Sequence, residues 1–89
     1  MTARYRLDWR SSARKDLNRL DRQVAARILL AINALTNNPR PPGVKRLKGA
    51  ANLWRIRVGD YRVVYAIEDD RLVVLVTTVA GRGAVYRDI

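Results

Sequence analysis

Four arginines and one tyrosine in the second half of the chain are the residues best suited to chemistry: Arg55, Arg57, Arg62, Arg82 and Tyr86. If the fold gathers them into one patch, they could act on a phosphodiester. Cleavage of RNA by its own 2′-hydroxyl needs a group that removes the hydroxyl proton, a group that protonates the leaving 5′-oxygen, and positive charge on the phosphorane. Arginine suits the third task, because it is permanently charged and can hold phosphate through two N–H groups.

Proton transfer is the task for which the sequence offers least. Arginine is a poor base because it keeps its proton. The chain contains no histidine and no cysteine, which removes the commonest general acid or base, a thiolate nucleophile and any disulfide. Tyr86 is then the natural candidate, provided that neighbouring guanidinium groups lower the pKa of its phenol. A tyrosine near a chain end is more often part of a core or its rim, so both interpretations stay open.

A predicted β-hairpin carries three of these arginines. Alternation over residues 54–58 predicts a strand with its apolar side chains on one face and Arg55 and Arg57 on the other. Gly59-Asp60 suits a two-residue type II′ turn. The resulting register places Arg57 directly opposite Arg62, which costs up to roughly 1 kcal/mol. A surface that binds a polyanion would explain this arrangement; solvated, splayed arginines explain it equally well.

The whole chain is predicted to be one small α+β domain spanning residues 1–89, with the element order β-α-α-β-β-β. A mainly antiparallel, curved sheet packs against an N-terminal helical hairpin. Residues 5–9 form the first strand; Ser11 or Ser12 caps the first helix and Asp21 caps the second. Prolines in residues 37–43 end the second helix. Residues 72–79 form a central strand, and a two-residue loop at Asp69-Asp70 would place Arg62 opposite Thr77.

The balance of charge predicts an acidic partner. Lysine and arginine total 18 against 8 acidic residues, for a formal charge of +10. Such an excess suggests a nucleic acid, a ribosome-like surface or an acidic protein, although non-specific polycation behaviour is compatible with it. Part of the excess lies in residues 44–49, a predicted loop or short turn in which Lys45, Arg46 and Lys48 could contact phosphate or simply remain in water.

The sequence does not indicate a metal site, a nucleotide-binding loop, a signal peptide or a membrane-spanning segment. The carboxylates of Asp60, Asp69 and Asp70 fall in predicted turns and form no ligand cluster, so we expect no metal. Gly81-x-Gly83 lacks the strand-then-helix context of a nucleotide-binding loop, and we expect no cofactor. The start of the chain lacks the apolar core of a signal peptide, and no apolar run reaches membrane-spanning length. The cytoplasm is therefore the expected location.

Three segments of the sequence resemble the RelE-like branch of the RelE/ParE toxin superfamily. They are KRLKG at residues 45–49, LWRIRVGDYRVVY at residues 53–65 and RxxVYR at residues 82–87. The similarity extends over nearly the whole chain. It implies a small toxin of a type II toxin–antitoxin system that enters the ribosomal A site, contacts 16S rRNA and cuts mRNA without a metal or cofactor. It also implies a RelB-like antitoxin as the inhibitory partner.

The resemblance also implies roles for individual residues. Arg62 matches the arginine that stabilises the phosphate, Arg82 a second arginine, and Tyr86 the tyrosine that takes part in proton transfer or base stacking. Arg55 and Arg57 match two basic strand positions that are often lysine. The remaining cations expected to bind RNA or its phosphates are Lys45, Arg46, Lys48 and Arg87.

Two departures from the family pattern leave other functions open. Arginine replaces lysine at both strand positions, and Gly81 stands where many relatives carry histidine. Either change could weaken cleavage or shift proton transfer onto Tyr86. One alternative is a ParE-like toxin that inhibits DNA gyrase by binding. The retention of four residues argues against it: Arg57, Arg62, Arg82 and Tyr86. Another is a catalytically weak relative that acts as a binding module.

Overall fold

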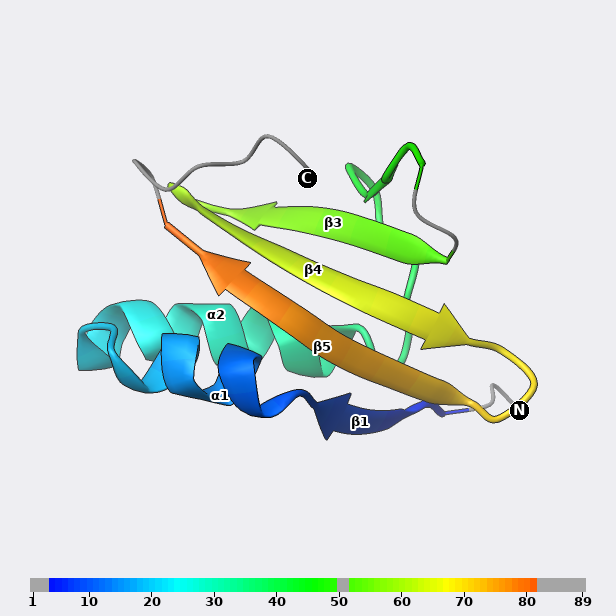
Figure 1. Cartoon of the computed structure of the whole chain (residues 1–89), viewed down its shortest axis with the longest axis horizontal. Coiled ribbons are helices and arrows are strands. Elements are labelled where there is room, and N and C mark those ends of the chain that lie inside the picture. Colours follow the sequence, from blue (N-terminus) through cyan, green and yellow to red (C-terminus); the bar gives the residue numbers. More distant parts are fainter. Residues whose placement is uncertain (1–3, 50–51, 82–89) are drawn as a thin grey trace.

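The structure is a computed structural model that describes residues 4–49 and 52–81 (Figure 1). Its elements in chain order are β1 (Arg6–Trp9), α1 (Ser11–Asn18), α2 (Arg22–Ala34), β2 (Lys45–Arg46), β3 (Leu53–Val58), β4 (Tyr61–Glu68) and β5 (Val73–Ala80). The predicted α+β class, helical hairpin and sheet are confirmed. The sequence missed β2: two residues of the expected loop, Lys45 and Arg46, pair with Arg55 and Trp54 of β3. That one domain spans residues 1–89 stays a prediction.

The five strands form one mixed sheet in the order β1-β5-β4-β3-β2. Only β1 and β5 run parallel; the other neighbouring pairs are antiparallel. Both helices lie on the same face, because residues of α1 and α2 belong to one buried cluster with β3, β4 and β5. Among residues 4–49 and 52–81, no helix covers the other face of the sheet. None of the helices among residues 4–49 and 52–81 is long and apolar enough to cross a membrane.

The two helices begin in different ways. Asp21 caps α2 as predicted, with its side chain accepting a hydrogen bond of 3.1 Å from the backbone N–H of Gln23. The predicted serine cap of α1 is wrong. Arg10 occupies the N-cap position without a side-chain hydrogen bond, and its own N–H donates to the carbonyl of Val76 at 2.9 Å. The start of α1 is thus determined by the pairing of β1 with β5.

The β3–β4 hairpin has the predicted register. Val58 lies opposite Tyr61, and Arg57 lies opposite Arg62. The other predicted pairs, Ile56 with Val63, Arg55 with Val64 and Trp54 with Tyr65, are also present. Gly59 has φ +60°, as the first central position of a type II′ turn requires. A two-residue loop preserves the alternation of both strands, so the apolar and basic faces stay separate through the turn.

The predicted β4–β5 register is wrong, because Arg62 lies opposite Ala80 and not Thr77. Two local features cause the shift of three residues. Glu68 pairs with Val73, so the loop is residues 69–72, and Leu72 in it has φ +55°. A bulge between Val64 and Tyr65 then shifts the register by one residue, and the Thr77 hydroxyl donates to the carbonyl of Val64 at 3.1 Å. Neither feature changes the overall hydrophobic pattern.

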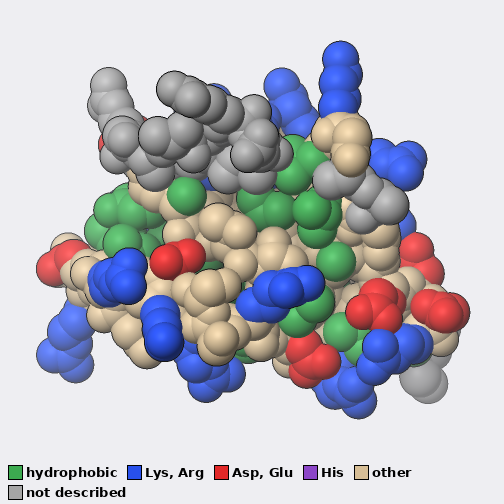
Figure 2. All heavy atoms as spheres, viewed as in Figure 1, with side chains coloured by type: hydrophobic (Ala, Val, Ile, Leu, Met, Phe, Trp, Pro, Cys, Tyr) green, Lys and Arg blue, Asp and Glu red, His purple; other side chains and the backbone are tan. Residues whose placement is uncertain are grey.

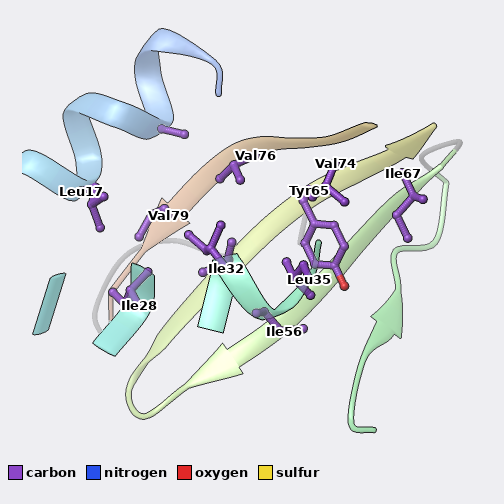
Figure 3. Close-up of a cluster of buried hydrophobic side chains, with 12 residues drawn as sticks. Leu17, Ile28, Ile32, Leu35, Ile56, Tyr65, Ile67, Val74, Val76 and Val79 are labelled. Atoms are coloured by element: carbon purple, nitrogen blue, oxygen red, sulfur yellow. The ribbon is translucent and has the colours of Figure 1, made fainter. Parts of the chain in front are cut away.

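The core fills the space between α2 and the sheet, with Tyr65 near its centre (Figure 3). Tyr65 is fully buried, and its hydroxyl donates to the carbonyl of Pro39 at 2.7 Å. Ile28, Ile32 and Leu35 of α2 are buried against the same cluster. Burial raises the pKa of the Tyr65 phenol, so it stays a neutral donor. This hydrogen bond ties the segment after α2 to the middle of the sheet.

We predict that Tyr65→Phe lowers the free energy of unfolding by about 1 to 3 kcal/mol, because the Pro39 carbonyl loses its buried donor. Urea titration followed by circular dichroism measures the change. Tyr61→Phe is the matched control, since the Tyr61 ring is only half-buried. Equal effects of the two substitutions would contradict a specific contribution from the Tyr65 hydroxyl.

Candidate functional site

The face of the sheet away from the helices carries three of the predicted site residues, Arg55, Arg57 and Arg62. Their strand neighbours Ile56 and Val63 belong to the core, so alternation directs the arginines to the opposite face. Arg57 lies directly across from Arg62, and Arg55 lies next along β3 on the same face. We call these three residues the arginine face. The structure thus brings together the three predicted catalytic residues that lie within the described ranges.

The other predicted residues fall in different places. Lys45 pairs with Arg55 and so joins the arginine face, whereas Arg46 pairs with Trp54 and lies on the helix side. Lys48 is exposed in the turn that follows β2. The remaining predicted residues, Arg82, Tyr86 and Arg87, lie outside the residues that the structure describes.

The arginine face is only partly open to water. Arg57 is exposed, but Arg55 and Arg62 are half-buried. Val64, which lies opposite Arg55 on β4, is 2% exposed. The Nε of Arg55 is buried and has no hydrogen-bond partner among the described residues. Leaving such a donor unpaired costs about 1 to 3 kcal/mol, more when the group is charged.

The chemistry available on this face is the stabilisation of negative charge. Guanidinium groups that share a face can bind one phosphate from two sides, and half-burial strengthens the interaction by excluding water. No group of acidic, histidine or cysteine residues within residues 4–49 and 52–81 could hold a metal. Basic side chains are spread over much of the surface seen in Figure 2, so net charge alone would not have located this face.

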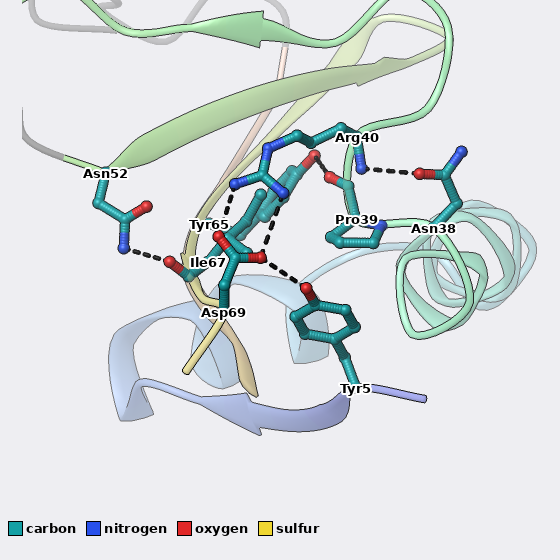
Figure 4. Close-up of polar contacts among 8 residues, drawn as sticks. All are labelled: Tyr5, Asn38, Pro39, Arg40, Asn52, Tyr65, Ile67 and Asp69. Carbon is teal, nitrogen blue, oxygen red and sulfur yellow. Dashed lines mark hydrogen bonds and ion pairs between the residues drawn. The ribbon is translucent and has the colours of Figure 1, made fainter. Parts of the chain in front are cut away.

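Arg40 is the residue that sequence reasoning missed (Figure 4). Its guanidinium donates two hydrogen bonds to the carboxylate of Asp69, at 3.2 and 2.9 Å. The hydroxyl of Tyr5 donates to the same carboxylate at 2.5 Å. These contacts join the segment after α2, the β4–β5 loop and the residue before β1. Since 29 residues separate Arg40 from Asp69, no local pattern in the sequence indicates the pair.

Trp54 lies beside two arginines on the helix side of the sheet. The Arg40 guanidinium is 4.9 Å from the centre of the Trp54 ring, and that of Arg46 is 5.9 Å away. Both distances are within the range of cation–π attraction. Arg46 therefore has a packing role in this structure, and its predicted contact with RNA stays a prediction.

Gly81, the departure from the family pattern noted above, packs against the ring of Tyr61. A Cβ atom at Gly81 would lie 2.8 Å from Cε2 of Tyr61, closer than real contacts allow. A larger side chain at this position would therefore require the Tyr61 ring to move. The glycine and the tyrosine form one packing unit at the end of β5.

The chain matches a family model described as the ParE toxin of the type II toxin–antitoxin system, parDE, over residues 7–86. Among curated proteins, it is 37% identical over 84 residues to Toxin RelE of Mycobacterium tuberculosis, covering 93% of this chain and 87% of that protein. It is 30% identical over 77 residues to Putative toxin RelE1 of Methanocaldococcus jannaschii, covering 83% of this chain and 86% of that protein.

Solved structures of similar fold include two toxin–antitoxin complexes. The archaeal RelE–RelB complex from Pyrococcus horikoshii has a chain that matches with a TM-score of 0.78 and 30% identity, covering 96% of this chain and 100% of that one. The RelBE2 toxin–antitoxin complex from Mycobacterium tuberculosis matches with a TM-score of 0.81 and 27% identity, covering 94% and 98%. The relatives carry RelE names, whereas the family model carries the ParE name.

We predict that the stabilisation contributed by Asp69 disappears in acid. Hydrogen bonds from Arg40 and, to a smaller extent, from Tyr5 hold the pKa of the Asp69 carboxyl below its usual range. A lowered folded-state pKa means that the stabilisation is complete above the unfolded pKa of about 4 and is lost as the pH falls through the folded pKa. Urea titrations at several pH values should therefore show Asp69→Asn less stable than wild type at pH 7, with the difference shrinking below about pH 4.

Asp70→Asn is the control for this measurement, because the neighbouring Asp70 is exposed. It should change the free energy of unfolding little at any of these pH values. A difference between wild type and Asp69→Asn that stays constant into acid would contradict the ion-pair explanation.

We predict that Gly81→Ala destabilises the fold by about 1 to 3 kcal/mol through overpacking against Tyr61. Combining it with Tyr61→Ala should reduce this cost, because the smaller residue makes room for the new methyl group. Thermal unfolding of the four proteins of this double-mutant cycle gives the interaction free energy. Additive effects would show that the two residues do not share one packing unit.

Proposed function

We propose that this chain, which belongs to the RelE/ParE superfamily of toxins of type II toxin–antitoxin systems, is an endoribonuclease that cleaves mRNA in the ribosomal A site. The observation that carries the proposal is the arginine face, where Arg57 is held directly opposite Arg62 beside the half-buried Arg55. Like charges held directly opposite each other on neighbouring strands destabilise a sheet, and a bound polyanion would offset that cost. A phosphate between the two guanidinium groups turns that repulsion into attraction.

The proposed reaction is an internal phosphoryl transfer that uses no metal. The 2′-oxygen loses its proton and attacks the adjacent phosphorus, which forms a 2′,3′-cyclic phosphate, while the bond to the 5′-oxygen breaks and that oxygen gains a proton. Arg55, Arg57 and Arg62 stabilise the charge that develops on the phosphorane oxygens. Arg82 is proposed to add to this charge, by its match to the family motif.

Proton transfer is assigned to Tyr86, also by its match to the family motif. Since Arg55 and Arg57 occupy positions that are often lysine, neither strand position supplies a group that can release a proton near neutral pH. A phenol surrounded by guanidinium groups has a lowered pKa and can exchange a proton more readily. The proposal therefore makes the rate depend on Tyr86 as well as on the arginines.

The rest of the proposed surface binds RNA without reading its sequence. Lys45 continues the arginine face, and Lys48 is exposed beyond β2. With Arg46 and Arg87 they are proposed to contact phosphates of mRNA and 16S rRNA. Each such contact releases counterions, so association should weaken steeply as salt increases. Action on the ribosome would place the protein in the cytoplasm.

A RelB-like antitoxin is proposed as the inhibitory partner. The similar structures from Pyrococcus horikoshii and Mycobacterium tuberculosis are complexes of a toxin with an antitoxin. A formal charge of +10 favours an acidic partner, because opposite charge increases the rate of association.

Inhibition of DNA gyrase is the second candidate function, and the ParE description of the matching family model favours it. A gyrase inhibitor would act by binding and would need no group for proton transfer. A supercoiling assay with purified chain and gyrase separates the two functions. Inhibition of supercoiling at a concentration that leaves translated mRNA intact would replace the endoribonuclease proposal.

We predict that Arg62→Ala and Tyr86→Phe each lower mRNA cleavage by about 10² to 10³-fold and relieve growth arrest, because each removes a group that acts in the transition state. Cleavage is measured on translating ribosomes with purified protein. Arg22→Ala is the control, because Arg22 is exposed on α2, and this variant should cleave like wild type. Circular dichroism must show that all three variants are folded. A double variant that remains fully toxic would remove both residues from the mechanism.

A further inference from the structure

The last part of β5, residues 77–80, extends beyond the end of β1. Trp9, the last residue of β1, pairs with Val76, and the N–H of Arg10 donates to the carbonyl of Val76 at 2.9 Å. Figure 1 shows β5 continuing past the end of β1. Among residues 4–49 and 52–81, no strand pairs with residues 77–80 on that side. The position of this end of β5 therefore depends on other contacts.

A β-bulge lies within this part of β5. Val64 pairs with Thr78, whereas the next residue of β4, Tyr65, pairs with Val76. Thr77 is therefore an extra residue in β5. Bulges bend a strand and redirect the side chains that follow, and they are over-represented next to active sites.

The hydrophobic core requires this extra residue. Val76 and Val79 both belong to the buried cluster, although they are three residues apart. In a regular strand, the side chain two residues after Val76 would share its face. Thr78 would then enter the core and Val79 would leave it. The bulge is thus a consequence of burying valines instead of a threonine.

The bulge also determines which residue lies opposite Arg62. Arg62 pairs with Ala80, whereas a regular strand would place Val79 there. That change would move every later residue by one position, about 3.4 Å along the strand, and to the opposite face. Arg82 comes two residues after Ala80 in the sequence. The bulge therefore sets the point from which the chain enters the segment that carries Arg82 and Tyr86.

The hydroxyl of Thr77 connects the two strands at the bulge. It donates a hydrogen bond of 3.1 Å to the carbonyl of Val64, and the Thr77 side chain is half-buried. An extra residue disrupts the regular hydrogen bonds between neighbouring strands. The hydroxyl supplies a donor at the point of disruption.

The carboxylate of Asp16 holds the same end of β5 from α1. It accepts a hydrogen bond of 3.4 Å from the backbone N–H of Val79. Leu17, the next residue of α1, belongs to the same buried cluster as Val79 (Figure 3). The packing of α1 therefore keeps the carboxylate beside β5. Two side chains from different elements thus restrain the four residues that precede Gly81.

We propose that Thr77 and Asp16 are positioning residues for RNA cleavage, because they hold the bulged end of β5 in the register that directs Arg82 and Tyr86 towards Arg62. The role in cleavage rests on the proposed function; the two hydrogen bonds and the register do not. Both residues lie outside the three segments that resemble the toxin family.

Loss of either contact should slow the chemical step and leave RNA binding unchanged. Lys45 and Arg57 lie on β2 and β3, and neither hydrogen bond involves those strands. A displacement of about 1 Å in a group that acts in the transition state can cost about 100-fold in rate. The variants should therefore lower kcat and change KM little.

Cleavage by full-length variants over a range of concentrations of translating ribosomes gives kcat and KM separately. Thr77→Val keeps the shape of the side chain and loses the hydroxyl, so it should lower kcat at least tenfold and change KM less than twofold. Thr77→Ser keeps the hydroxyl and should stay within threefold of wild type. Thr78→Val changes the neighbouring half-buried threonine and should also stay within threefold.

Asp16 provides an independent pair of variants. Asp16→Ala should lower kcat at least fivefold, whereas Asp16→Asn keeps an oxygen that can accept from Val79 and should stay within twofold of wild type. Lys15→Ala, at an exposed neighbour on α1, is the control and should cleave like wild type. Because the two contacts come from different elements, either pair decides the proposal if circular dichroism shows that a variant of the other pair is unfolded.

Four results would overturn the proposal. They are a wild-type kcat in Thr77→Val or Asp16→Ala, an equal loss in Thr78→Val, a loss that Thr77→Ser or Asp16→Asn does not restore, and a rise in KM in place of the loss in kcat.

Amide hydrogen exchange, followed by nuclear magnetic resonance, separates this proposal from the proposed function. Exchange at Val79 and Ala80 should be at least tenfold faster in Thr77→Val and Asp16→Ala than in wild type, and it needs no cleavage. A wild-type chain that cleaves no mRNA loses the proposed enzymatic function, and the positioning role with it, even if exchange responds as expected. A chain that cleaves mRNA but shows equal exchange in all variants loses the positioning role alone.

Discussion

The separation of the two faces of the β3–β4 hairpin is the constraint on which the rest of the structure depends. A two-residue turn at Gly59 keeps both strands in phase, so burying Ile56 and Val63 places Arg57 and Arg62 opposite each other on the far face. A one-residue change in that register would bury the arginines and expose the core. The fold therefore cannot form with its core intact unless it also assembles the arginine pair.

Contacts between distant parts of the chain support this hairpin from one side. Tyr65 lies opposite Trp54, and its hydroxyl holds the segment after α2 through Pro39. One residue later, Arg40 binds Asp69 and lies over Trp54. The same segment, through Pro41 and its neighbours, lines a hollow of about 490 Å³ between α2 and β3. β3 thus carries Arg55 and Arg57 of the arginine face and, between them, Ile56 of the core.

The features that could be predicted from the sequence are those that depend on residues close together in the chain. Alternation and the Gly59 turn determined the β3–β4 register, and Asp21 determined the start of α2. The bulge at Val64 and Tyr65 left no trace in the hydrophobic pattern, so the position opposite Arg62 was assigned wrongly. The partnership of Arg40 with Asp69 depends on tertiary packing across 29 residues, and the pairing of β2 depends on β3 being already in place. The roles of Arg82 and Tyr86 rest on their motif alone.

The central claim is that the opposed guanidinium groups serve phosphoryl transfer to a 2′-oxygen. The most direct measurement is the chemistry of the RNA ends formed on translating ribosomes after expression of the chain without antitoxin. The account predicts a 2′,3′-cyclic phosphate on the upstream fragment and a 5′-hydroxyl on the downstream fragment. A 5′-phosphate and a 3′-hydroxyl, or growth arrest with intact mRNA, would contradict it.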